Sequence, residues 1–258
     1  MKRANVVRVA VTSMALVAVL SACATVPTTA PQAGGAGVVA GQPTTSPAES
    51  GTSAKAAEND PDGVRVAIVG DSLTAGGGRL LSAGLTPNTW MTYAMGSGID
   101  YVGGYAKGGS TIEEQAAAAR PVGAVDALVL MSGTNDVRLG IPFDKAAPSY
   151  DEVVSTIGAA HVIVAGIPPY DRNPAAAARY EKKLEAFVAE RGWTFVDPWG
   201  FARDGDRYAP GVSQDGIHPT TAGYRQLGEN LRRTILDTVD RRGTEQASAV
   251  VADGSTTS

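Results

Sequence analysis

The stretch VRVAIVGDS, residues 64–72, decides the fold class of this chain. Its apolar and largely β-branched run stops at Gly-Asp-Ser, which is typical of a buried strand that ends at a polar corner. Three later runs have the same character, namely residues 127–131, 161–165 and 194–196. Apolar residues at three- and four-residue spacing predict helices over 174–191 and 220–239. Strands that alternate with helices favour an α/β domain whose mostly parallel sheet is covered on both faces.

The composition limits the classes of function. The chain has 258 residues, of which 43% are hydrophobic and 19% are charged, and this balance is typical of a globular protein. It has 22 Lys and Arg against 26 Asp and Glu, and the resulting net charge of -4 argues against a nucleic-acid partner. A single cysteine, Cys23, excludes an intramolecular disulfide and a multi-cysteine zinc site. The two histidines, His161 and His218, are the only positions for imidazole chemistry.

The N-terminus has the layout of a secretory signal peptide, which we place at residues 1–22. A positively charged start is followed by an apolar run over 9–20 that is too short to span a bilayer, and then by small residues. Leu20-Ser21-Ala22-Cys23 resembles the lipobox of bacterial lipoproteins, which implies a lipid anchor on Cys23 and a membrane-attached protein that faces outward. The alternative is ordinary cleavage at the same small residues, which would release a soluble secreted protein.

The rest of the chain divides into three parts. Residues 23–61 are rich in Pro, Thr, Ala and Gly and predict a lipidated N-terminus followed by a flexible linker. We place the folded domain at 62–241 and expect it to be a monomer. Residues 242–258 are polar and aperiodic and are expected to form a disordered tail.

Polar residues that follow the predicted strands should meet at one edge of the sheet, because ligands of parallel sheets bind at the carboxyl ends of the strands. Ser72 ends the first strand, where it is either an exposed nucleophile or only a helix cap. Asp215 precedes His218 by three residues, so its carboxylate can accept a hydrogen bond from Nδ1 and leave Nε2 free to take a proton from a serine. Seen alone, that segment is also compatible with an ordinary turn. We expect His161 to be a packed residue at the end of a strand.

A serine nucleophile also needs hydrogen-bond donors for the negatively charged oxygen that forms in the reaction. Two places offer them: the backbone around Gly108 and Gly109, and the side-chain amide of Asn135 at the end of the 127–131 strand. Either segment alone would also suit a turn.

Four segments of the chain carry a resemblance to a known family. In order they are Gly70-Asp71-Ser72-Leu73, a glycine before Ser110-Thr111, Gly133-Thr134-Asn135-Asp136, and Asp215-x-x-His218-Pro219. They resemble the blocks of the GDSL or SGNH hydrolase family of serine esterases and lipases. The resemblance implies a three-layer α/β/α flavodoxin-like sandwich with a mostly parallel central sheet, the SGNH hydrolase fold.

The resemblance also implies roles for individual residues. Ser72 would be the nucleophile, His218 the base and Asp215 the residue that orients the base. The oxyanion hole would consist of the Ser72 N–H, the Gly109 N–H and the Asn135 side chain, with Gly108 as the alternative to Gly109. No cofactor and no metal are implied.

The function expected from the sequence is that of an exported serine hydrolase that cleaves carboxylic O-acyl esters through an acyl-enzyme. An exported enzyme meets the cell envelope, so short-chain esters or glycan and lipid esters of the envelope are the expected substrates. Arg138 and Tyr170 follow two of the strands and are expected to bind substrate, unless they are ordinary solvated loop residues. The alternatives are an acyltransferase that uses the same triad on envelope sugars, and a non-catalytic envelope-binding lipoprotein.

Overall fold

The computed structural model describes residues 62–253. The predicted signal peptide at 1–22, Cys23 with its predicted lipid, and the linker at 23–61 lie outside the described residues, as do residues 254–258. None of the helices within the described part is long and apolar enough to cross a membrane.

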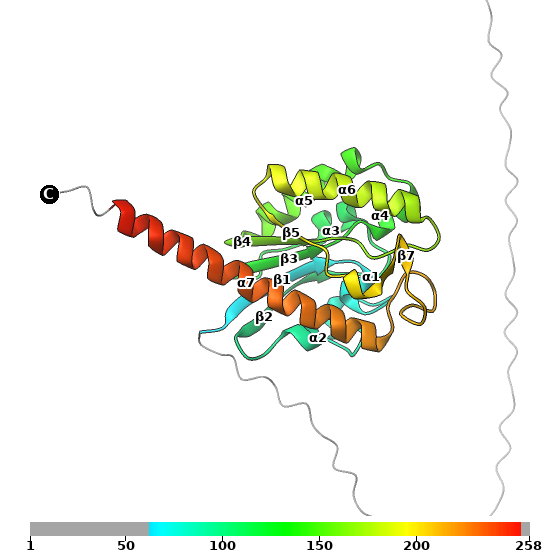
Figure 1. The fold of residues 1–258 in the computed structure, drawn as a ribbon, viewed down its shortest axis with the longest axis horizontal. Helices are drawn as coiled ribbons and strands as arrows, with labels where there is room; N and C mark the ends of the chain where they lie inside the picture. The colour runs from blue at the N-terminus through cyan, green and yellow to red at the C-terminus, as the bar shows by residue number, and fades with distance from the viewer. Residues whose placement is uncertain (1–61, 254–258) are drawn as a thin grey trace, which may run out of the picture. The chain divides into compact units, whose positions relative to one another are not determined.

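A five-stranded parallel sheet forms the centre of the domain (Figure 1). Its strands lie in the order β2-β1-β3-β4-β5, which is the strand order of flavodoxin-like folds. The strands are β1 (Val64–Gly70), β2 (Ile99–Ala106), β3 (Ala127–Met131), β4 (His161–Ala165) and β5 (Thr194–Val196). The four strands predicted from the sequence are confirmed, and so is the expected three-layer α/β/α architecture.

Helices cover both faces of this sheet because successive strand residues point to opposite sides. Ala67 and Val69 of β1 pack with the helices of one face, whereas Val66 and Ile68 pack with those of the other. The first face is covered by α3 (Ile112–Ala118), α5 (Phe143–Ile157) and α6 (Pro174–Glu190). The second face is covered by α2 (Met91–Ala94) and α7 (Thr221–Asp253).

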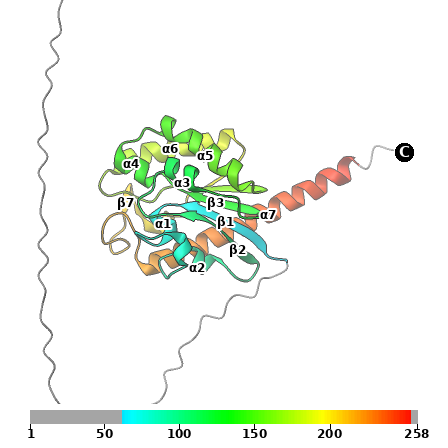
Figure 2. The same cartoon turned by 180° about the vertical axis from the view of Figure 1, so that it is seen from behind.

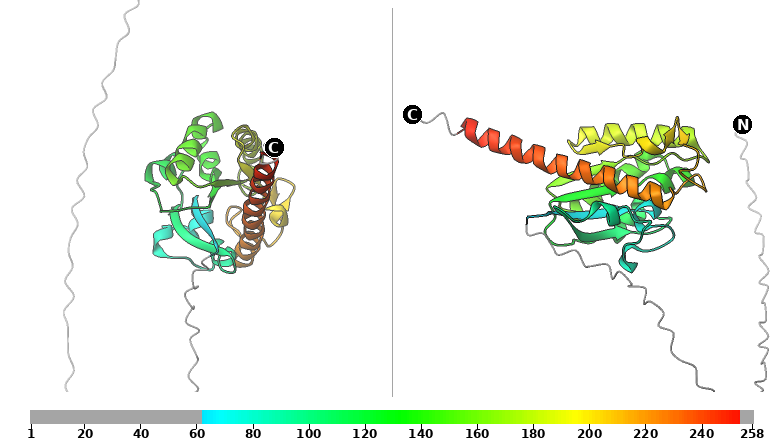
Figure 3. Two further views of the ribbon diagram at one scale, coloured as in Figure 1. Left: turned by 90° about the vertical axis from the view of Figure 1, so that its left-hand side faces the viewer. Right: turned by 60° about the horizontal axis from the view of Figure 1, so that its bottom comes forward.

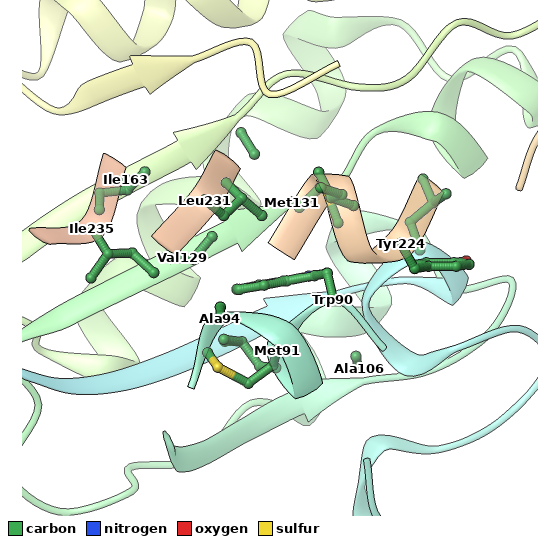
Figure 4. Close-up of a cluster of buried hydrophobic side chains, with 14 of the residues drawn as sticks. Trp90, Met91, Ala94, Ala106, Val129, Met131, Ile163, Tyr224, Leu231 and Ile235 are labelled. Atoms are coloured by element: carbon green, nitrogen blue, oxygen red, sulfur yellow. The ribbon is translucent and has the colours of Figure 1, made fainter. Parts of the chain in front are cut away.

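The second face is filled by a core around Trp90, which is fully buried. Figure 4 shows Trp90 among side chains from α2, from the sheet and from α7, including Met91, Val129 and Leu231. The Trp90 indole N–H donates to the Thr74 hydroxyl at 3.3 Å. The core on this face is therefore tied directly to α1 (Ser72–Ala75), the helix that begins with the candidate nucleophile.

The remaining elements are short and connect the layers. They are η1 (Leu81–Ala83), α4 (Thr134–Leu139), η2 (Gly200–Ala202), and a hairpin of β6 (Arg203–Asp204) and β7 (Arg207–Tyr208). The labels α1, α4 and β7 appear at the same end of the sheet in Figures 1 and 2.

Strand β2 was not predicted from the sequence. It is an edge strand, most of its residues are only half-buried, and Gly103 and Gly104 interrupt its apolar pattern. A Cβ on Gly104 would lie 1.9 Å from the Ile68 carbonyl oxygen, so the close approach of β1 requires glycine there. Helices α3 and α5 were likewise not singled out.

The end of the chain also differs from the expectation. Helix α7 continues to Asp253 instead of giving way to a disordered tail at 242, and its far end extends past the sheet (Figures 1 and 3). The reason is that 240–253 contains no proline and half of its residues are Arg, Glu, Gln or Ala, which favour helix; the one glycine, Gly243, does not end the helix that begins at Thr221.

Candidate active site

Ser72 lies at the corner between β1 and α1, with its hydroxyl 2.8 Å from His218 Nε2. The cap of α1 is Asp71, whose carboxylate accepts from the Leu73 N–H at 2.9 Å. The capping role considered for Ser72 is therefore filled by its neighbour, and the serine hydroxyl is left for the histidine. The corner is tight, because a Cβ on Gly70 would meet the Met131 carbonyl oxygen at 2.6 Å.

The turn before α7 brings Asp215 and His218 together. Asp215 Oδ2 lies 2.7 Å from His218 Nδ1, and Oδ1 accepts from the backbone N–H groups of Ile217 and His218 at 2.9 and 2.8 Å. Although burial acts to raise it, these hydrogen bonds lower the pKa of Asp215 to about 2. The carboxylate therefore stays ionised at neutral pH and can stabilise a protonated imidazole.

Asp171 and Tyr208 support this turn, a role that the sequence predicted for neither residue. The Asp171 N–H donates to the Gly216 carbonyl at 3.1 Å, and the Asp171 carboxylate accepts from the Tyr208 N–H at 2.9 Å. The Tyr208 hydroxyl in turn donates to the Ile217 carbonyl at 2.8 Å. The loop after β4 and the β6–β7 hairpin thus hold the segment that presents His218, through pairings between residues that are far apart in the sequence.

The two backbone N–H groups expected in the oxyanion hole, those of Ser72 and Gly109, are available as donors. Within residues 62–253, neither the Ser72 N–H nor the Gly109 N–H has a hydrogen-bond partner, whereas the Gly108 N–H donates to the Arg79 carbonyl at 2.9 Å. Both glycines line the same cavity as Ser72. Gly109 has a φ of 81°, in the left-handed region that favours glycine. Of the two glycines, Gly109 is the one with a free donor.

Asn135 follows β3 and is held on both sides of its amide. Its Nδ2 donates to Asp71 Oδ2 at 3.1 Å and to the Ser110 carbonyl at 3.0 Å, while its Oδ1 accepts from Arg138 Nε at 3.0 Å. Both amide hydrogens are thus directed at protein acceptors. An oxyanion at this amide has to share one of these hydrogens or replace one of the two acceptors.

Two carboxyl groups near Asn135 are buried, that of Asp71, which accepts from its amide, and that of the next residue, Asp136. Burial raises the pKa of Asp71 to about 7, against the hydrogen bond from the Leu73 N–H. Burial likewise raises the pKa of Asp136 to about 6, against the hydrogen bond from the Ile112 N–H at the start of α3. Asp71 ties the amide of Asn135 to the nucleophile corner, and Asp136 ties α4 to α3. Sequence reasoning found both residues inside motifs but assigned them no role.

A cavity of about 220 Å³ opens at Ser72. We call it the serine cavity, and it is lined by Ser72, Gly78, Gly108, Gly109, Thr134, Asn135, Arg138, Tyr170, Ile217 and His218. Both residues predicted to bind substrate line it, Arg138 as an exposed side chain and Tyr170 as a buried one. His161 is the first residue of β4, at the end of that strand away from the cavity. In the described part of the chain, no cluster of three or more His, Cys, Asp or Glu side chains could hold a metal ion.

Comparisons with known proteins agree with this geometry. Residues 68–226 match the model of the GDSL-like lipase/acylhydrolase family. A putative lipolytic protein of the G-D-S-L family from Desulfitobacterium hafniense has a similar structure, with 21% identity, a TM-score of 0.55 and coverage of 66% of this chain and 98% of that one.

Two further structures share the fold. A lipase/acylhydrolase from Enterococcus faecalis has 21% identity and a TM-score of 0.54, with coverage of 67% of this chain and 95% of that one. A family 3 carbohydrate esterase from Clostridium thermocellum has 20% identity and a TM-score of 0.51, with coverage of 69% and 98%. A comparison with curated proteins gave no match.

Proposed function

The chain belongs to the GDSL-like lipase/acylhydrolase family and is an ester hydrolase, and from this premise we propose that it works through a triad of Ser72, His218 and Asp215. The observation that carries the proposal is the continuous hydrogen-bonded series from the Ser72 hydroxyl through both ring nitrogens of His218 to the Asp215 carboxylate. Such a series provides a nucleophile, a base and a group that fixes the tautomer of the base.

In the first half of the reaction, Ser72 Oγ bonds to the ester carbonyl carbon and its proton passes to His218 Nε2. When the tetrahedral intermediate collapses, the bond between the carbonyl carbon and the alcohol oxygen breaks, and the same proton goes to the departing alcohol. Water then attacks the acyl-enzyme, gives a proton to His218 and releases the acid, and Ser72 recovers its proton. The sum is ester plus water giving acid plus alcohol.

The oxyanion is stabilised by the N–H groups of Ser72 and Gly109 and by the amide of Asn135. Gly109 is favoured over Gly108 because, among the described residues, the Gly109 N–H has no hydrogen-bond partner, whereas the Gly108 N–H donates to the Arg79 carbonyl. Asn135 adds its hydrogen bond as the carbonyl oxygen gains charge, because a charged acceptor competes better for the amide than the neutral Ser110 carbonyl does.

The test is the hydrolysis of p-nitrophenyl acetate by the full-length protein and by Ser72→Ala. The variant should lose at least about a thousandfold in kcat, because among the described residues Ser72 Oγ is the only hydroxyl hydrogen-bonded to His218 Nε2, while its melting temperature stays near that of the wild type. A fluorophosphonate probe should label the wild type and not the variant. Hydrolysis by Ser72→Ala at a near-normal rate would refute the triad.

The substrate is a short-chain acyl ester of a cell-envelope glycan or lipid. The small volume of the serine cavity, about 220 Å³, supports a short acyl group, which contacts Arg138 and Tyr170. A series of p-nitrophenyl esters from acetyl to palmitoyl measures this directly. A preference for palmitoyl would contradict the small acyl site.

The location of the enzyme is proposed from the sequence alone. Cys23, at the end of the predicted signal peptide, carries a lipid that anchors the protein to the outer face of the membrane, and the linker at 23–61 holds the domain away from the lipid. Labelling with radioactive palmitate should give a labelled wild-type protein and an unlabelled Cys23→Ala protein. A labelled variant would exclude this anchor.

A further inference from the structure

His218 lines two cavities, of which the mechanism uses only one. The second cavity, which we call the outer cavity, has a volume of about 380 Å³ and is lined by Asn88, Gln214, Asp215, His218, Pro219, Thr220 and Thr221. It shares only His218 with the serine cavity. Neither Ser72 nor any of the proposed oxyanion donors lines it.

The chemistry of ester cleavage decides which part of a substrate lies in which cavity. The carbonyl must lie at Ser72 Oγ with its oxygen at the donors of Gly109 and Asn135, so the acyl group occupies the serine cavity. The alcohol oxygen must lie where His218 can give it a proton. The alcohol must therefore lie beside His218, and the outer cavity is the second cavity that this histidine lines.

The lining of the outer cavity suits hydroxyl groups. Four of its side chains, those of Asn88, Gln214, Thr220 and Thr221, are neutral hydrogen-bonding groups. Thr221 Oγ1 donates to Asn88 Oδ1 at 2.8 Å, which fixes the orientation of that amide and turns its N–H groups away from Thr221. Among the described residues, neither Asn88 Nδ2 nor the Gln214 amide has a hydrogen-bond partner.

The same lining disfavours other kinds of alcohol. Pro219 is the one apolar residue among those that line the cavity, so a long-chain alcohol would contact few apolar side chains there. No Lys or Arg is among the lining residues, so a phosphate-bearing headgroup would lack a cation. The ionisable side chains among the lining residues are those of Asp215 and His218, which are hydrogen-bonded to each other.

We propose that the outer cavity is the binding site for the leaving alcohol and that this alcohol is a neutral polyhydroxylated group, a sugar. The inference rests on the proposed hydrolase function and narrows it, because it selects glycan esters over lipid esters. Asn88 and Gln214 determine this specificity by hydrogen bonding to the sugar hydroxyls, and each hydrogen bond contributes about twofold to tenfold in binding.

The experiment compares three esters with the same acyl group: 6-O-acetylglucose, hexyl acetate and p-nitrophenyl acetate. The full-length wild type should have a kcat/KM for 6-O-acetylglucose at least about tenfold above that for hexyl acetate. The double variant Asn88→Ala, Gln214→Ala should lower kcat/KM for the sugar ester about tenfold. It should change the p-nitrophenyl acetate rate less than about twofold, because p-nitrophenolate leaves readily without protonation or specific binding. That rate also shows that the variant is folded.

The matched control is Gln226→Ala, which removes an amide of the same size from α7 outside both cavities. It should leave all three rates unchanged. A wild type that prefers hexyl acetate, or a double variant that lowers all three rates equally, would overturn the sugar site while the hydrolase function stands. A wild type that cleaves none of the three esters would instead refute the proposed function, and the inference with it.

Discussion

Replacing Asp215 by Asn should remove nearly all turnover, because the turn around it dictates how the new amide lies. Oδ1 of Asp215 accepts two backbone N–H groups, from Ile217 and His218. The amide oxygen must keep this place, since an NH₂ group there would face two donors. The NH₂ group is therefore directed at His218 Nδ1, where the carboxylate now lies at 2.7 Å.

This orientation reverses the tautomer of the imidazole. When Nδ1 accepts from the amide, the ring proton lies on Nε2, the atom 2.8 Å from the Ser72 hydroxyl, and Nε2 can no longer take the serine proton. Loss of the correct tautomer in a triad of this kind lowers kcat about 10⁴-fold, which corresponds to about 5 kcal/mol of transition-state stabilisation. The fold should change little, because the two backbone hydrogen bonds to Oδ1 are kept.

The assay is p-nitrophenyl acetate hydrolysis at about pH 7.5, with thermal unfolding of the same samples. Asp144→Asn is the matched control, since it makes the same isosteric change at an exposed carboxylate whose one ion pair within residues 62–253 is with Lys183. It should leave both kcat and stability nearly unchanged. If Asp215→Asn kept more than about a tenth of wild-type kcat, the orienting role of Asp215 would be refuted.

Three further outcomes are expected. Asn135→Ala should lower kcat about 10² to 10³-fold with little change in KM, because the Asn135 amide stabilises charge that develops in the transition state. Equal changes in kcat and KM would contradict this role. Trp90→Ala should lower the free energy of unfolding by about 3–5 kcal/mol, as measured by unfolding in urea, since this fully buried ring fills the core under α7. A loss below about 1 kcal/mol would contradict that packing. Burial raises the pKa of Asp71 from 3.8 to about 7, so between these pH values the folded state binds more protons than the unfolded state. The free energy of unfolding should therefore fall as pH rises through this window, by up to about 4 kcal/mol. Urea unfolding between about pH 5 and 7.5 measures this slope, which Asp71→Asn should flatten; an unchanged slope in the variant would exclude Asp71 as its source.

The sequence by itself determined the features that depend on residues close together in the chain. The apolar run that ends at Gly70 predicted β1, and the spacing of apolar residues predicted α6 and the first part of α7, because hydrophobic periodicity reports local structure. The pairing of Asp215 with His218 could also be predicted, since the two residues share one turn. The four ordered motifs placed Ser72 and Asn135 at strand ends, where the structure has them.

Only the tertiary structure decided how distant segments meet. Strand β2 could not be assigned because an edge strand with two central glycines has no buried apolar pattern, and its place beside β1 is a long-range pairing. The choice of Gly109 over Gly108 depends on a hydrogen bond from Gly108 to Arg79. The engagement of both Asn135 amide hydrogens depends on Asp71 and Ser110, which lie 64 and 25 positions away in the sequence.

The outer cavity is the clearest case of such a tertiary feature. It joins Asn88, from the loop before α2, to Gln214 and Thr221 from the region around the start of α7. Thr221 and Asn88 are 133 positions apart, and neither belongs to a motif. Local propensity does not encode a contact at that separation. Packing of α2 and α7 on the same face of the sheet brings the two segments together, and it thereby shapes the site that we assign to the leaving alcohol.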